Sequence, residues 1–223
     1  MNTAAMLERM PNPVSPDTET VEQYDRILSA GDYDVVVVGA GFAGLTAAIE
    51  AHNCGASVLV LEKMKAPGGN SIISDGGIAA AGTALQRRLG VEDSPELMYR
   101  DMLRAGMGLN HPDLVRVVAE RSAEVVDWSI HCLGVEYLDR LDQFGGHSVA
   151  RCFTAMGVTG ATIIRCQLEK LRTLGIELRP QSCLQRLLTD GAGRVWGVQV
   201  RVGFVYGDPE EGRDITLRAR RAV

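Results

Sequence analysis

The sequence lacks the segments that mark membrane-spanning and secreted proteins. Its apolar runs all fall short of the ~20 residues that a helix needs to cross a bilayer. The N-terminal stretch MNTAAMLERMPNPVSPD has neither a basic start nor an apolar core, so it is not a secretory signal. We therefore expect a cytoplasmic protein without a membrane span.

Paired cysteines and a basic excess are missing as well. No CxxC or CxxCH occurs among the five scattered cysteines, so the sequence predicts no zinc knuckle, no covalent haem and no metal site. The formal net charge of −5 gives no reason to expect nucleic-acid binding, which usually shows as a basic excess. What is present is an ordinary chain of 223 residues, 46% of them hydrophobic, which can bury a sizeable core.

Residues 33–62 carry the most informative pattern in the chain. The valine run 35–38 is typical of a fully buried parallel strand. A glycine turn, an apolar helical face and a second apolar run at 58–61 follow it, and Glu62 ends the unit. This order predicts a strand, a turn, a helix and a second strand that ends on an acid.

The glycines and the acid of this unit predict a dinucleotide site. Gly39 permits a tight turn, Gly41 lets the backbone approach a pyrophosphate, and Gly44 lets the helix pack closely on the strand. The phosphates then lie against the helix N-terminus, and Glu62 can accept the ribose hydroxyls. A plain structural turn is the alternative, and the glycines alone do not distinguish FAD from a nicotinamide dinucleotide.

A glycine-rich loop is predicted over residues 63–83. Glycine pairs at 68–69 and 76–77 bracket small polar residues, and backbone N–H groups in such a loop can cradle an extended ligand. A mobile surface loop is the alternative interpretation. The isoleucines in this stretch favour a loop that lies buried against another part of the protein.

The remaining pattern predicts a flexible leader and a series of helices and strands. The leader covers 1–32 and contains a short helix at 20–30, and the domain itself covers 33–223. The further predicted elements are helices over 94–105, 111–134 and 163–175, a strand over 176–179, a hairpin of strands 183–188 and 194–202, and a strand over 215–221. Because Ala222 and Val223 begin another apolar run, we expect the chain to be a fragment.

The two longer helices before residue 135 are predicted to serve packing. Ser94 is the expected N-cap of the first. The second should pack through one apolar side made of Leu114, Val117, Val118, Val125 and Trp128. We interpret His111 as a helix-terminus residue and His131 as a packed helix residue, with neither as a ligand.

In combination these motifs resemble the flavoprotein subunits of fumarate reductase and succinate dehydrogenase, most closely the soluble flavocytochrome c type fumarate reductases. The resemblance runs from about Tyr33 to the last residue. Its motifs are VVVVGAGFAGLTAA, LEKMKAPGGNS, DGGIAAAGT, DSPELMYRDML, NHPDLVRVV and GIELR followed by a hairpin. The stretch GGHSVARCFTAMGVTG, residues 145–160, is also similar to L-aspartate oxidases.

The resemblance implies a Rossmann-like α/β domain that binds FAD, with a parallel sheet, flanking helices and a β-hairpin or meander. The cofactor-binding residues that it implies are Gly39, Gly41, Ala43, Gly44, Glu62, Lys63, Gly69, Asn70, Ser71, Asp75, Gly76, Gly77 and Leu184. Asn70 stands where membrane-bound members of the superfamily carry a histidine bonded covalently to the flavin. Asparagine cannot form that bond, so FAD is expected to be held non-covalently.

The implied reaction is hydride transfer between flavin N5 and a C=C or CH–CH unit of a small carboxylate substrate, served by an electron-donor protein or domain. The family's catalytic residues lie in segments that would follow Val223, so the fragment alone is expected to be inactive. Arg151 and His147 are the local catalytic candidates, and positioning of their loop is the other interpretation. The alternatives are an NAD(P)-dependent Rossmann dehydrogenase and a catalytically silent FAD-binding module.

Overall fold

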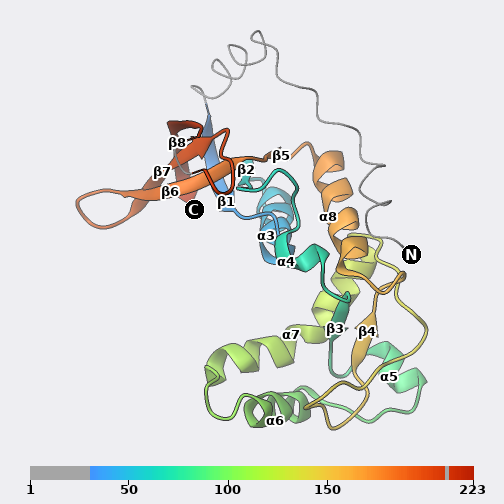
Figure 1. Ribbon diagram of the computed structural model, residues 1–223. Coiled ribbons are helices and arrows are strands. Elements are labelled where there is room, and N and C mark those ends of the chain that lie inside the picture. Colours follow the sequence, from blue (N-terminus) through green and yellow to red (C-terminus); the bar gives the residue numbers. More distant parts are fainter. Residues whose placement is uncertain (1–30, 209–210) are drawn as a thin grey trace.

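The computed structural model describes residues 31–208 and 211–223 in two lobes (Figure 1). The predicted helix over 20–30 and the leader up to residue 30 lie outside the described residues. No helix within the two described ranges is long and apolar enough to cross a bilayer.

The upper lobe in Figure 1 is built on a six-stranded sheet. Its strands, in spatial order, are β5 (Glu177–Arg179), β2 (Val58–Leu61), β1 (Asp32–Val38), β8 (Arg213–Ala222), β7 (Val195–Val202) and β6 (Ser182–Thr189). The first four run parallel, and β8, β7 and β6 form an antiparallel meander. The predicted α/β fold with a parallel sheet and a hairpin is confirmed.

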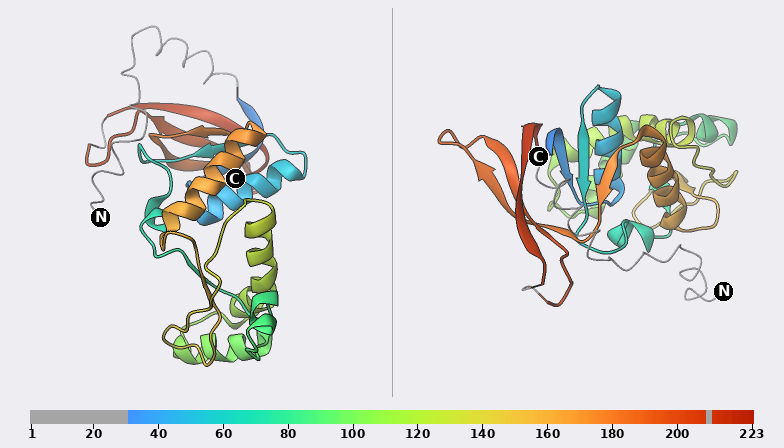
Figure 2. Two further views of the ribbon diagram at one scale, coloured as in Figure 1. Left: turned by 90° about the vertical axis from the view of Figure 1, so that its right-hand side faces the viewer. Right: turned by 90° about the horizontal axis from the view of Figure 1, so that it is seen from above.

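Helices cover one face of this sheet, and the meander folds over the other (Figure 2). Leu45 and Ile49 of α3 (Phe42–Asn53) and Ile164 and Leu171 of α8 (Gly160–Leu174) form one core with Val60 of β2. On the opposite face, apolar side chains of the parallel strands pack against those of the meander: Val36, Leu59, Leu61, Val198, Val200, Leu217 and Ala219. The centre of the sheet is therefore buried on both sides.

The valine run of β1 is less buried than its sequence predicts. Val36 is fully buried, but Val35 and Val37 are partly exposed and Val38 is 44% exposed. Val38 belongs to neither core because it lies at the carboxyl end of the strand, where the chain turns away into α3.

The lower lobe holds a second, two-stranded sheet and three helices. Strands β3 (Gly77–Ala79) and β4 (Cys152–Thr154) pair antiparallel beside α5 (Ala84–Arg88), α6 (Pro95–Ala105) and α7 (Pro112–His131). The segment predicted as one loop over 63–83 thus contains β3 and also a short helix, α4 (Gly69–Ile72). Ser94 caps α6 as predicted, since its Oγ accepts the N–H of Leu97 at 3.1 Å. The helix predicted from residue 163 begins earlier, at Gly160, because Thr159 caps it.

The apolar side predicted to pack α7 into the protein is wrong for its aliphatic members and right for Trp128, which is partly buried against the core that α3 and α8 form. Its aliphatic members, which are between 49% and 65% exposed, are Leu114, Val117, Val118 and Val125. The helix buries its neighbouring face instead, through Val115, Ala119, Ser122, Val126 and Ser129. Small residues on that face allow close approach: the Ser122 hydroxyl lies 3.0 Å from the N–H of Ala81, which donates to it. His131, predicted to be packed, is exposed at the end of the helix, and His111 is the N-cap.

Adjacent valines of α7 test which face is covered. Val126→Ala removes two buried methyl groups and should lower the free energy of unfolding by about 2 kcal/mol. Val125→Ala changes a half-exposed side chain and should alter it by less than about 0.5 kcal/mol. Denaturant unfolding followed by circular dichroism measures both. Equal losses in the two variants would contradict the packing described here.

Candidate functional site

Strand β1 passes into α3 through a glycine turn, residues 39–41. Gly39 has a φ of +100°, a conformation that favours glycine, and its N–H donates to the carbonyl of Leu61 at 2.7 Å. A Cβ on Gly44 would lie 1.9 Å from the Gly39 carbonyl oxygen. Only glycine at position 44 therefore lets α3 pack this closely on the end of β1.

The first turn of α3 offers backbone donors to a ligand. N–H groups in the first turn of a helix have no carbonyl partner one turn earlier, and the helix dipole makes this end partly positive. The N-cap residue, Gly41, has no side chain to occupy those donors, and Ala43 is exposed. Such a helix start suits the binding of a phosphate.

Helix α4 lies directly against the glycine turn. The N–H of Gly68 donates to the carbonyl of Ala40 at 2.9 Å, and the N–H of Phe42 donates to the Ser71 hydroxyl at 3.2 Å. These bonds hold two segments about 30 residues apart side by side. The structure thereby joins the two glycine-rich stretches of the sequence.

The glycines leave an open cradle between the turn and α4. A Cβ on Gly41 would lie 3.3 Å from Ser71 Oγ and would narrow the gap between them. A Cβ on Gly39 or Gly69 would meet nothing within 4 Å, so both glycines border open space. Asn70 is exposed beside Gly69. An extended ligand can therefore lie along the backbone of both segments.

Glu62 is fixed at the end of β2 beside this cradle. Its side chain is buried, Oε2 accepts the N–H of Ala40 at 2.9 Å, and Oε1 accepts the N–H of Met64 at 2.8 Å. A carboxylate has about four acceptor positions, so each oxygen keeps capacity for a hydroxyl. Lys63, the next residue, is exposed.

The start of β6, two residues before Leu184, is held against Glu62 where the chain passes from β5 to β6. The N–H of Ser182 donates to the Glu62 carbonyl at 2.9 Å, and the N–H of Glu62 donates to the Arg179 carbonyl at 2.9 Å. Leu184 is partly buried against the core of the meander. The crossing therefore brings the start of the edge strand β6 to Glu62, while Leu184 itself packs on the core of the meander.

Next to Glu62 lies a polar cluster of Tyr33, Glu177 and Arg179 that was not predicted from the sequence. The Tyr33 hydroxyl donates to Glu177 Oε2 at 2.6 Å, and Arg179 donates to Glu177 Oε1 at 2.6 Å and to the Tyr33 oxygen at 2.9 Å. Burial, followed by the bond to Glu177, raises the pKa of Tyr33 to about 12. Alternation along β5, which puts Glu177 and Arg179 on one face, is the only sequence signal for this cluster.

The second glycine pair lies farther along, where the loop meets α8. Gly76 has a φ of +73°, and a Cβ there would lie 2.7 Å from the Thr159 carbonyl. The N–H of Gly77 donates to Asp75 Oδ1 at 3.0 Å, and both residues are exposed. The structure therefore places these residues on the loop that leads from the cradle into the lower lobe.

A family model described as FAD binding domain matches residues 34–223. The chain belongs to this FAD-binding family. The acrylate reductase flavoprotein subunit of Shewanella woodyi is 40% identical over 86% of this chain and 38% of its own length. L-aspartate oxidase of Streptomyces coelicolor is 36% identical over 76% of this chain and 29% of its own.

A solved structure, the open conformation of a flavocytochrome c3 fumarate reductase, matches with a TM-score of 0.78 at 32% identity. The match covers 94% of this chain and 36% of that one. The predicted resemblance to fumarate reductase flavoproteins is confirmed, and so is the similarity to L-aspartate oxidases. The FAD-binding domain described here spans less than two fifths of each of these relatives.

The cradle fits FAD by its donor set. An anionic pyrophosphate suits the first turn of α3, whose N-cap, Gly41, has no side chain to occupy the backbone donors or to fill the space in front of them. The Glu62 carboxylate, held by two backbone N–H groups, suits the hydroxyls of a ribose. The match to the family and this geometry therefore indicate the same cofactor.

Arg151 of the FAD-binding domain lies in the lower lobe, completely buried, and its guanidinium is occupied by carboxylates. Nε and Nη2 donate to the two oxygens of Asp93 at 3.0 and 2.9 Å, and Nη1 lies 3.0 Å from Asp101 Oδ2. Burial would raise the pKa of Asp101, but bonds from Ser148 and the charges of Arg151 and Arg104 bring it below its usual range. His147 lies beside Arg151, with its Nδ1 3.4 Å from Nη1.

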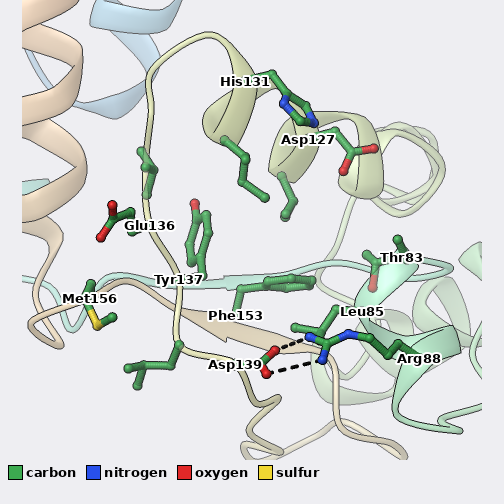
Figure 3. A pocket seen from close by; sticks show the side chains of 15 residues that line it. Thr83, Leu85, Arg88, Asp127, His131, Glu136, Tyr137, Asp139, Phe153 and Met156 are labelled. Carbon is green, nitrogen blue, oxygen red and sulfur yellow. Dashed lines mark hydrogen bonds and ion pairs between the residues drawn. The ribbon is translucent and has the colours of Figure 1, made fainter.

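The lower lobe also contains an open hollow of about 660 Å³ at the end of α7 (Figure 3). Tyr137 and Phe153 form its apolar wall, their rings packed edge to face, and an ion pair of Arg88 with Asp139 lies at its rim. His131 lines it from the last turn of α7. None of the predicted cofactor residues lines this hollow.

Proposed function

We propose that this chain is the FAD-binding part of an oxidoreductase of the fumarate reductase and succinate dehydrogenase type. Bound FAD would supply hydride transfer between its N5 and a C=C or CH–CH unit beside a carboxylate. The observation that carries the proposal is the buried Glu62 carboxylate, fixed by two backbone N–H groups at the edge of a glycine cradle. The relatives named for acrylate, fumarate and L-aspartate support a small carboxylate as the substrate class.

Within this proposal the chain holds the cofactor at both ends. The first turn of α3 binds the pyrophosphate, Glu62 binds the adenosine ribose, and the backbone near Leu184 borders the adenine. The loop through Asp75 and Gly77 lines the flavin side. Asn70 supplies no nucleophilic ring nitrogen, so the FAD is held by non-covalent contacts alone.

Glu62→Gln should weaken FAD binding roughly 10- to 100-fold, because a hydrogen bond to a charged group contributes about 1.5–3 kcal/mol. Glutamine also places an NH₂ group against one of the two backbone N–H donors, those of Ala40 and Met64. Equilibrium dialysis followed by flavin absorbance measures the dissociation constant. Glu124→Gln, at an exposed residue paired within its own helix, is the control. If the Glu62 variant binds FAD with the affinity of the wild type, Glu62 does not contribute to FAD binding.

The cofactor and its attachment are tested on the purified chain. We expect an oxidised-flavin spectrum after incubation with FAD and release of all flavin into the supernatant on acid precipitation. A colourless protein that binds NADH would favour a nicotinamide-dependent dehydrogenase instead. Flavin that stays with the precipitated protein would contradict non-covalent binding.

The reaction class is tested on the product of the complete gene. We expect dye-linked reduction of acrylate or fumarate, or oxidation of succinate or L-aspartate. Flavin binding without any of these activities would instead support a catalytically silent FAD-binding module.

A further inference from the structure

We infer that Arg151 fixes His147 as a neutral imidazole with its proton on Nε2, and that this N–H binds a carboxylate oxygen of a small substrate in the adjoining hollow. The substrate class rests on the proposed function, whereas the state of His147 follows from its neighbours alone. Arg151 is then a positioning residue, and His147 is a binding residue.

The donor count of Arg151 determines which nitrogen of His147 carries the proton. A guanidinium has two hydrogens on each Nη and accepts none. Nη1 forms an ion pair with Asp101 Oδ2 at 3.0 Å and lies 3.4 Å from His147 Nδ1, to which it can only donate. Nδ1 must therefore be the acceptor, because a proton on it would oppose a donor. In a neutral imidazole the proton then lies on Nε2.

The groups around His147 also favour its uncharged form. Burial lowers its pKa most, the Arg151 charge lowers it further, and Asp101 and Asp93 act in the opposite direction. The two carboxylates are themselves engaged: Asp93 by Arg151, and Asp101 by Arg151, by Arg104 and by the Ser148 N–H and hydroxyl. The negative charges of Asp93 and Asp101 are thus largely neutralised by these partners, which weakens their tendency to raise the pKa of His147.

A hollow of about 560 Å³ adjoins this histidine. Its lining combines apolar side chains, glycines and polar groups: Ala79, Met98, Met102, Ala105, Val118, Gly106, Gly145, Gly146, Asp101, Asn110 and His147. No hydrogen-bond partner for Nε2 of His147 occurs among residues 31–208 and 211–223. Nδ1 faces Arg151, and Nε2, the ring nitrogen on the other side of Cε1, can donate to a ligand in the hollow that His147 lines.

The hollow lies next to the loop through Asp75 and Gly77, which the proposed function assigns to the flavin side. Ala79 lines it from β3, two residues beyond Gly77, whose added Cβ would lie 3.8 Å from the Phe144 ring. Phe144 in turn accepts the N–H of His147 through its carbonyl at 3.2 Å. The Asp101 carboxylate in the lining is already engaged by Arg151, Arg104 and Ser148, so the imidazole donor is not cancelled by a free anion. An imidazole donor beside mostly apolar walls suits a small molecule that has an apolar body and a carboxylate, such as acrylate.

Nitrogen-15 spectra of the histidine rings test the state of His147 in the flavin-loaded chain. At about pH 6.5, where an ordinary histidine is half protonated, we expect neutral His147 with Nδ1 unprotonated and Nε2 protonated. The spectrum of the His147→Ala variant assigns the signals. A proton on Nδ1, or a charged ring at this pH, would overturn the role assigned to Arg151.

Titration with sodium acrylate tests the ligand. We expect a saturable shift of the His147 Nε2–H signal and none at His131, which lies outside this hollow. In parallel calorimetric titrations, His147→Gln, whose amide N–H replaces the Nε2 donor, should keep most of the affinity, whereas His147→Ala should lose tenfold or more. Absence of a shift, or equal losses in both variants, would overturn the binding role.

The same samples separate this inference from the proposed function. Normal flavin occupancy without a response to acrylate would refute the role of His147 and leave the cofactor assignment intact. Failure to bind FAD, with the predicted state of His147, would instead refute the proposed function.

Discussion

Gly44→Ala is expected to abolish FAD retention and to destabilise the upper lobe. The added Cβ would lie 1.9 Å from the Gly39 carbonyl oxygen and 3.1 Å from its carbon. Both are backbone atoms, so no side-chain rotation relieves the contact, and α3 must move away from β1. We expect a cost at or above the upper end of the about 1–3 kcal/mol typical of overpacking.

Loss of flavin follows from the same movement. The first turn of α3 carries the donors for the pyrophosphate, and Leu45 and Ile49 of this helix are completely buried in the core. A shift of the helix therefore alters the cradle and the packing together. Denaturant unfolding measures the stability, and flavin absorbance after gel filtration measures retention.

Gly191→Ala is the matched control for this experiment. Gly191 lies in the hairpin turn after β6, and a Cβ there would meet nothing within 4 Å. It should retain FAD and unfold at nearly the same denaturant concentration. If Gly44→Ala behaves like this control, the glycine turn described here is wrong.

Local chemistry explains which elements could be predicted from the sequence. The glycines at 39 and 44, the Ser94 cap and the turn between β6 and β7 each constrain a few consecutive residues. Such signals need no knowledge of the rest of the fold, because φ, capping and turn geometry are local. The main strands and helices could be placed from such signals and from apolar runs, whereas the short elements α4, β3, α5 and β4 were not predicted.

Contacts between distant segments explain what could not be predicted. Periodicity shows that α7 has an apolar side, but it does not show that Ala119 and Ser122 permit the closer approach. Likewise, no pattern joins Arg151 to Asp93, which lies 58 positions earlier. The glycines of the cradle and Glu62 could be predicted from the sequence. The hydrogen bond that places Ser71 against Phe42 could not, because it depends on how α4 packs against the glycine turn.

Arg151→Met should lower the stability of the lower lobe by about 3–5 kcal/mol, because removing one partner of a buried ion pair leaves an uncompensated charge. Here the loss affects two carboxylates at once, since Asp93 and Asp101 are both buried and both contact Arg151. Methionine has a similar shape, so the effect comes from charge and hydrogen bonding more than from volume. Denaturant unfolding at neutral pH measures it.

Arg121→Met is the control, because Arg121 and Glu124 form an exposed pair whose loss should cost at most about 1 kcal/mol. If Arg151→Met does not fold, Arg151→Lys keeps the charge but not the two-pronged contact with Asp93, and it should be intermediate between wild type and unfolded. A variant at position 151 as stable as the control would show that the buried cluster contributes no stability.

Lowering the pH should reduce the difference in the free energy of unfolding between Arg151→Met and the wild type. The pKa of Asp101 in the folded protein is lowered, in part by Arg151, so this group stabilises the wild type fully above its unfolded pKa. That contribution is lost as the pH falls below about 4, the ordinary pKa of an aspartate, towards the folded-state value. The variant lacks the Arg151 share of this stabilisation and therefore has less to lose. Unfolding curves from neutral pH to below pH 4 should converge, and parallel curves would mean that Arg151 acts through packing alone.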